Sequence, residues 1–159
     1  MATGEKPEVP AGTPDEVALL LGWLGYLRGA VLRKAEGLSE SDARWTPDSR
    51  LIPLLGIVNH LTHVEWRWID GAMKGQDVSR SEEEFAPNSD LTVEAALAAY
   101  RRRAEDTDTA VRSMSLTQPS VWDADKDLRW VLLHLINETA RHAGHADATR
   151  EMLDGTTGE

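Results

Sequence analysis

The sequence predicts an all-α protein, a four-helix bundle. Apolar residues recur at helical spacing in four long segments, no segment shows the strict alternation typical of strands, and clusters of turn-forming residues separate the helical segments. The chain of 159 residues fits one domain that is long enough to bury a core. We therefore expect a single bundle over residues 13–155, after a disordered N-terminal tail over residues 1–12.

The first helix is expected to begin at Thr13 and to end near Glu36. Thr13 offers an N-cap hydroxyl, Pro14 is tolerated in a first turn, and Gly37 is a typical helix stop. Its apolar stripe consists of Val17, Leu20, Leu21, Leu24, Leu27, Val31 and Leu32. A short turn of helix is predicted next, over residues 39–42.

Three further helices are predicted from the same periodicity. The second covers residues 52–74, and the acidic segment 75–89 after it is expected to be a surface loop. The third covers residues 92–114. The last covers residues 127–154 and stops before a glycine, so at about 1.5 Å per residue it can span the whole bundle.

The composition restricts the possible partners. The chain has no cysteine, so any thiol chemistry must use a thiol that another molecule supplies. Its net charge of −10 repels phosphate backbones and anionic lipids, so neither nucleic acid nor a membrane is an expected partner. Without a targeting segment or a membrane-spanning stretch in the sequence, a cytoplasmic protein is expected. Apolar residues on loops and helix faces are compatible with a homodimer.

A polar stripe on the last helix is the strongest functional signal. Its members are His134, Glu138, His142 and His145, which follow one another at spacings that place them on one helical face. Burial of a carboxylate and imidazoles is unfavourable unless they are paired or bind metal, so a stripe that faces the core predicts a divalent ion. A further ligand has to come from another helix, and the second helix offers His60 and His63.

Interpretations without a metal remain open for these residues. Glu138 can instead pair with Arg141, with Arg67 or with a protonated histidine. Taken singly, His63 and His134 have the ordinary roles of helical histidines, which are either exposed on the surface or packed in the interior with a hydrogen-bond partner.

Two other features have a structural interpretation and a functional one. Most of the six tryptophans are expected to pack the core or to seal the ends of the bundle. Those close to loops are alternative candidates for a substrate wall, namely Trp45, Trp68 and Trp122. The run Arg101–Arg103 suggests an anion site, but acidic residues follow it at once, so we expect it to lie in solvent.

Two segments together resemble a known family. These are LLGIVNHLTHVEWRW in the second helix and VLLHLINETARHAGHADATRE in the last helix. They resemble the DinB-like superfamily, and more closely its actinobacterial branch that contains mycothiol-dependent S-transferases. The likeness extends over residues 17–155 and implies a four-helix bundle of DinB-like type.

The resemblance implies a metal triad of His60, Glu138 and His142. Many members have histidine where this chain has Glu138, and the glutamate resembles the arrangement in mycothiol-dependent maleylpyruvate isomerase. His145 stays open as a fourth ligand, as an acid or base beside the metal, or as a group that supports a ligand. His63 can serve similarly.

A triad with an open position indicates a catalytic site. By resemblance, the reaction is transfer of a thiol, mycothiol, to a small electrophile, with the metal favouring the thiolate and with His145 or His134 handling protons. Zinc is the first expectation for the metal, and nickel, iron and manganese suit the same donors. The alternatives are a metal-dependent hydrolase or thiol-assisted isomerase, and a non-catalytic metal-binding stress protein.

Overall fold

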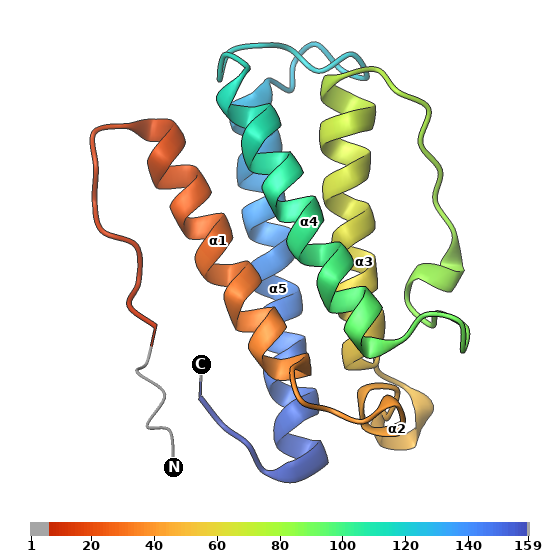
Figure 1. Ribbon diagram of the computed structural model, residues 1–159. Coiled ribbons are helices and arrows are strands. Elements are labelled where there is room, and N and C mark those ends of the chain that lie inside the picture. The colour runs from red at the N-terminus through yellow and green to blue at the C-terminus, as the bar shows by residue number, and fades with distance from the viewer. Residues whose placement is uncertain (1–6, 159) are drawn as a thin grey trace.

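The computed structural model describes residues 7–158, and these residues are helical without any strand, which confirms the predicted all-α class. Four long helices lie side by side (Figure 1). They are α1 (Glu16–Ala35), α3 (Leu54–Trp66), α4 (Val93–Arg112) and α5 (Leu128–Asp154), and the short elements are α2 (Glu40–Ala43), η1 (Pro47–Ser49), η2 (Arg67–Met73) and η3 (Glu82–Glu84). Part of the predicted tail, residues 1–6, lies outside the described residues. Within residues 7–158, no helix combines the length and the apolar character that crossing a membrane requires.

Side-chain caps define where the long helices begin. Asp127 caps α5 by accepting a hydrogen bond from the Trp130 amide, and the helix ends at Asp154, followed by the C-cap Gly155, whose φ of 75° suits glycine. The cap of α1 is Asp15, two residues later than the predicted Thr13. The reason is that the Asp15 carboxylate accepts from a first-turn amide of the helix, whereas the Thr13 hydroxyl accepts from the Asp15 amide outside it.

The predicted second helix is not one continuous α-helix. It begins at Leu54, and after Trp66 the backbone widens into the π-helix η2, in which the Lys74 amide reaches back to the Ile69 carbonyl. A Cβ on Gly71 would lie 2.6 Å from the ring of Trp122, so a glycine there lets that ring pack closely on η2.

The direction of the helices explains the course of the chain between η2 and α4. α3 and α4 run in the same direction, opposite to α1 and α5 (Figure 1). Since α3 and α4 are parallel, the segment 74–92 has to return along the length of the bundle, and it does so beside α3. Gly56 permits this approach, because a Cβ there would lie 2.0 Å from the Phe85 carbonyl oxygen. We call residues 74–92 the return segment.

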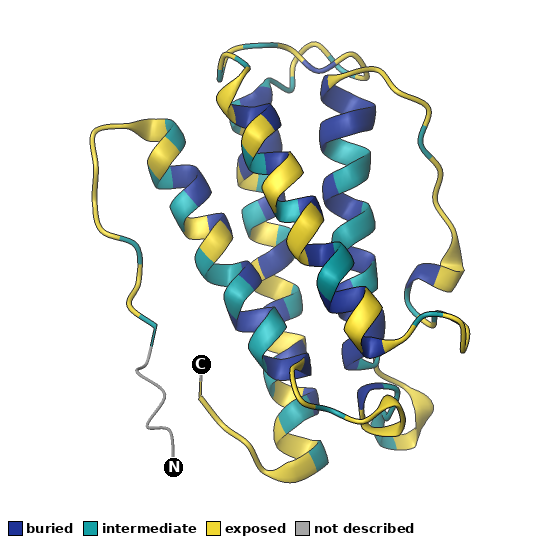
Figure 2. Cartoon of the chain, in the orientation of Figure 1, coloured by how far each residue is buried: buried dark blue, intermediate teal, exposed yellow. Residues whose placement is uncertain are grey.

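The prediction that residues 75–89 form a surface loop is wrong for one residue. Most of this stretch is exposed, but Glu84 is only 4% exposed, because the return segment presses its η3 turn against α3. The buried stripes of the long helices face inward, and most connecting segments are exposed (Figure 2).

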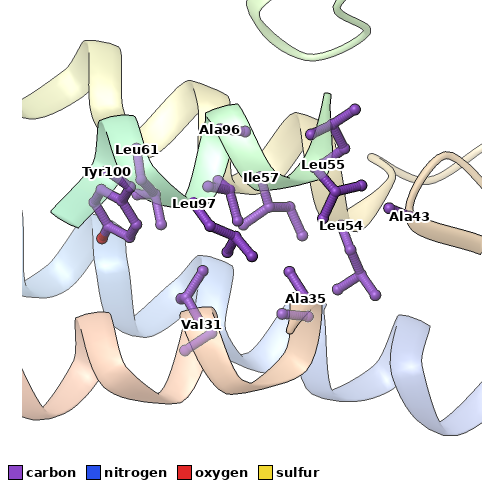
Figure 3. Packing of buried hydrophobic residues seen from close by; sticks show 14 of the residues in the cluster. Val31, Ala35, Ala43, Leu54, Leu55, Ile57, Leu61, Ala96, Leu97 and Tyr100 are labelled. Atoms are coloured by element: carbon purple, nitrogen blue, oxygen red, sulfur yellow. The ribbon is translucent and has the colours of Figure 1, made fainter. Parts of the chain in front are cut away.

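The interior contains two apolar clusters. One includes Val31, Leu54, Ile57, Leu61, Leu97 and Tyr100 (Figure 3), and the other includes Leu24, Ile69, Val111, Leu128, Leu132 and Leu135. Between them along α1 and α3 lies a buried ion pair, in which Arg28 donates to both carboxylate oxygens of Glu65 at 2.7 and 2.8 Å. Arg28 also donates to Asp108 of α4 at 2.8 Å, so three helices share this charged group.

Two expectations about side chains hold only in part. No tryptophan of the chain is buried, because Leu, Val, Ile and Ala fill most of the seams between the helices, but Trp68 packs against the second apolar cluster. The arginine run is exposed at Arg101 and Arg102 as expected, but Arg103 is buried. Its guanidinium pairs with Asp70 and contacts the Thr107 hydroxyl, so η2 supplies the countercharge that permits burial.

Candidate metal centre

His60 of α3 and Glu138 and His142 of α5 come together where these two helices pack. Each can offer one donor atom such that all three donors lie within 4.8 Å of one another. The Glu138 Oε2 atom lies 3.8 Å from Nε2 of His60 and 3.5 Å from Nε2 of His142. Zinc binds such donors at about 2.0–2.2 Å, which separates two ligands of a tetrahedral ion by about 3.4 Å. The three side chains therefore fit one divalent ion with small adjustments.

The ring of His60 is held from two sides by the return segment. Its Nδ1 atom lies 3.2 Å from Oε2 of Glu84, and the ring of Phe85 stacks on the imidazole at a centroid distance of 4.3 Å. A carboxylate at Nδ1 selects the tautomer that carries its proton on Nδ1 and leaves a lone pair on Nε2, the atom that faces Glu138. Arg67 donates to both oxygens of Glu84 and keeps that carboxylate in place.

The pKa values favour the forms that bind metal. Burial lowers the pKa of His60, although the hydrogen bond with Glu84 acts in the opposite direction. Burial, with smaller repulsion from His60, lowers the pKa of His142 to about 4. Burial alone would raise the pKa of Glu84, but the hydrogen bonds from Arg67 lower it overall. At neutral pH the two imidazoles are therefore neutral and the carboxylate behind His60 is charged.

The structure also bears on the interpretation without a metal. Glu138 forms no ion pair with Arg67 or Arg141 within residues 7–158, since Arg67 is bound to Glu84. A pair with a protonated histidine is disfavoured by the lowered pKa values of His60 and His142. The metal therefore remains the better-supported partner for this carboxylate.

The remaining histidines of the sequence analysis lie in different places. His134 borders a cavity that the three donors share, whereas His145 is exposed and only touches the outer side of His142, at a ring distance of 5.5 Å. His63 hydrogen-bonds through Nδ1 to the Asn59 carbonyl at 2.8 Å and lies outside the donor group.

The cavity beside the donors measures about 410 Å³. Its lining consists of His60, Val64, Arg67, Trp68, Arg80, Phe85, His134, Glu138 and His142. Of the three tryptophans considered for a substrate wall, Trp68 lines the cavity, Trp122 packs on Trp68 at 5.6 Å, and Trp45 is not part of the lining. A cavity of this size, lined by the three donors and by aromatic rings, suits a small organic molecule.

Sequence reasoning did not identify Glu84 and Arg80 as part of the site. Glu84 lies in an acidic run that is otherwise exposed, and its contact with His60 spans 24 positions of the chain. No local periodicity signals such a contact. The one available hint was that a buried metal-binding histidine normally needs a partner for its second nitrogen.

The fold and the site define an all-helical protein with a candidate His/Glu/His metal centre at an open cavity. The family model described as Mycothiol-S-transferase matches residues 19–155, and the chain therefore belongs to this family. The resemblance found in the sequence is thereby confirmed. A search among curated proteins finds no match.

The contact between Glu84 and His60 predicts the effect of Glu84→Gln on metal binding. The amide keeps the shape of the side chain but removes the charge that orients His60, so the affinity for zinc should fall about 10- to 100-fold. Competition with a chromophoric chelator measures this affinity. The exposed neighbour Glu83 provides the matched control, Glu83→Gln, which should bind zinc like the parent chain. Equal affinities of the two variants would contradict the role of Glu84.

The lowered pKa of His142 predicts how the stability of the metal-free protein depends on pH. The unfolded chain takes up the proton near the ordinary pKa of 6.5, and the folded protein only near 4. The contribution of neutral His142 to the free energy of unfolding is thus fully present above pH 6.5, and it is lost as the pH falls towards 4. For His142 this loss amounts to about 3 kcal/mol. Urea unfolding with a chelator present, at several pH values, should show a shallower dependence for His142→Gln. The same pH dependence of the free energy of unfolding in the parent chain and in His142→Gln would contradict the lowered pKa of His142.

Proposed function

We propose that this protein transfers a low-molecular-weight thiol, mycothiol, to a small electrophile at a divalent metal ion held by His60, Glu138 and His142. The observation that carries the proposal is the convergence of these donors from two helices on one open cavity. Family membership supports the thiol, and the absence of cysteine requires that the sulfur come from a cosubstrate. We propose zinc as the metal, with nickel, iron and manganese as alternatives that the same donors accept.

A divalent ion, when bound there, lowers the pKa of a thiol that coordinates it and so favours the nucleophilic thiolate. Glu84 keeps the donor nitrogen of His60 aimed at Glu138. Phe85 and Trp68 contribute apolar surface to the lining of the cavity.

His134 is the better-supported group for proton transfer, because it lines the cavity and His145 does not. Burial lowers the pKa of His134, so its imidazole is neutral and accepts the proton that the thiol loses. The sulfur then forms a bond to an electrophilic carbon. In an addition the proton passes to the product, and in a substitution the leaving group departs with the bonding electron pair.

The test is a turnover assay on the zinc-loaded protein with mycothiol and 1-chloro-2,4-dinitrobenzene, in which the S-conjugate and the remaining thiol are both measured. Conjugate formation should require mycothiol, and His60→Ala should abolish it. His63→Ala is the matched control, since His63 lies one helical turn away and outside the donor group. It should retain activity.

The alternatives give different results in the same assay across a panel of electrophiles, esters and amides. Turnover without any thiol would indicate a hydrolase, and a thiol that is required but not consumed would indicate an isomerase. No turnover by the parent chain or by His60→Ala would indicate a non-catalytic metal-binding protein. The DinB-like type of the bundle, a homodimer and a cytoplasmic location stay predictions.

A further inference from the structure

We infer that the electrophile of this site carries a carboxylate, which Arg80 binds, on a planar unsaturated or aromatic body that lies against Trp68 and His134. The inference rests on the proposed function, because it names the class of substrate for the same cavity. It starts from an exposed arginine that forms no ion pair within residues 7–158 and from an aromatic surface that lines the cavity.

Arg80 differs from the other arginine of the cavity. Arg67 is bound to both oxygens of Glu84, so its charge is neutralised. Arg80 is exposed, lines the same cavity, and forms an ion pair with no carboxylate within residues 7–158. A guanidinium presents paired donors that match the two oxygens of a carboxylate. The side chain is therefore free to bind an anionic group of a ligand.

The charges around the cavity favour an anion at this position. Arg67 is paired with Glu84, so Arg80 is the cationic side chain of the lining that forms no ion pair within residues 7–158. The carboxylate of Glu138 faces His60 and His142. An anionic substrate would thus meet the charge of Arg80 itself, beside the exposed carboxylates of Glu82 and Glu83 on the same segment.

The wall next to the donors has the geometry of a stacking surface. The ring of His134 is parallel to that of Trp130, with an interplanar angle of 11° and a centroid distance of 5.3 Å. Trp68 meets both rings at 4.6 and 5.4 Å. Of this group, Trp68 and His134 line the cavity. Flat, unsaturated molecules gain contact area and a favourable ring geometry on such a surface.

Arg80 and the carboxylate that orients His60 lie on the same stretch of chain. Arg80 lies four residues before Glu84 on the return segment, so the segment that orients His60 also presents the guanidinium. The electrophilic carbon would lie between a carboxylate held at Arg80 and the three donors, where the sulfur arrives.

The test compares two probes of nearly equal shape, trans-cinnamate and trans-cinnamamide, by isothermal titration calorimetry and by quenching of tryptophan fluorescence. It is made without any thiol, on the zinc-loaded and on the metal-free full-length protein. In both forms cinnamate should bind about tenfold more tightly than cinnamamide. Arg80→Gln should remove this difference by weakening the binding of cinnamate alone.

Arg102→Gln is the matched control, because Arg102 is exposed, lies outside this cavity and forms no ion pair within residues 7–158. It should leave both affinities unchanged.

A second variant tests the aromatic wall. Trp68→Leu should weaken both probes severalfold and keep the preference for cinnamate. Equal binding of the two probes by the parent chain, or cinnamate binding that Arg80→Gln does not weaken, would overturn the inference. Because no thiol is present, these outcomes are independent of whether the protein transfers mycothiol.

Discussion

His142→Ala is expected to remove stoichiometric metal from the protein and to lower thiol transfer by more than about 100-fold. The substitution takes away one of three donors, and the two that remain, His60 and Glu138, come from different helices. Two donors bind a divalent ion too weakly to keep it on the protein during purification, because water takes the place of the lost ligand. Elemental analysis of the purified variant, together with circular dichroism to verify its fold, measures the result.

His145→Ala is the control for this experiment. His145 lies three residues further along α5, is exposed and stands outside the donor group. We expect the variant to keep its metal. Retention of a full equivalent by His142→Ala would remove His142 from the centre, and loss of metal from His145→Ala would make His145 a fourth ligand.

Arg28→Met is expected to lower the free energy of unfolding by about 3–5 kcal/mol. Methionine fills a similar volume, so the main effect is that the Glu65 carboxylate stays buried without its countercharge. The side chains of Arg28 and Glu65 are only 5% and 2% exposed, so water cannot solvate the charge that is left. Urea unfolding of the purified variant, followed by circular dichroism, measures the change.

An exposed ion pair gives the comparison for Arg28→Met. Arg101 pairs with Glu36 at the surface, and both side chains are about half exposed, at 49% and 46%. Arg101→Met should therefore cost less than about 1 kcal/mol. The double variant Arg28→Met, Glu65→Leu should recover part of the lost stability, because apolar side chains can replace a buried pair. Equal losses for Arg28→Met and Arg101→Met would contradict a structural role of the buried pair.

The buried pair also matters for the candidate metal centre. Glu65 follows His60 on α3 by five residues, and its bonds to Arg28 of α1 restrict the rotation of α3 about its axis. This rotation decides whether His60 faces α5. We therefore regard the Arg28–Glu65 pair as part of the framework that brings the donors together.

The sequence by itself determined the features that depend on local spacing. The helix signals at Asp127 and Gly155 act within a few residues, and the same holds for the spacing that puts Glu138 and His142 on one face of α5. His60 could be proposed from the sequence because the helix that carries it has a strong apolar period and because of the family resemblance.

Only the tertiary structure decided what lies behind and beside these donors. Because α3 and α4 are parallel, the chain has to return along the bundle, and this return brings Glu84 to His60 and Arg80 to the cavity. The burial of Arg103 likewise depends on Asp70 of a distant helix. Such contacts join residues far apart in the chain and leave no periodic signal, since they arise from the direction of the helices and from the packing of one segment on another.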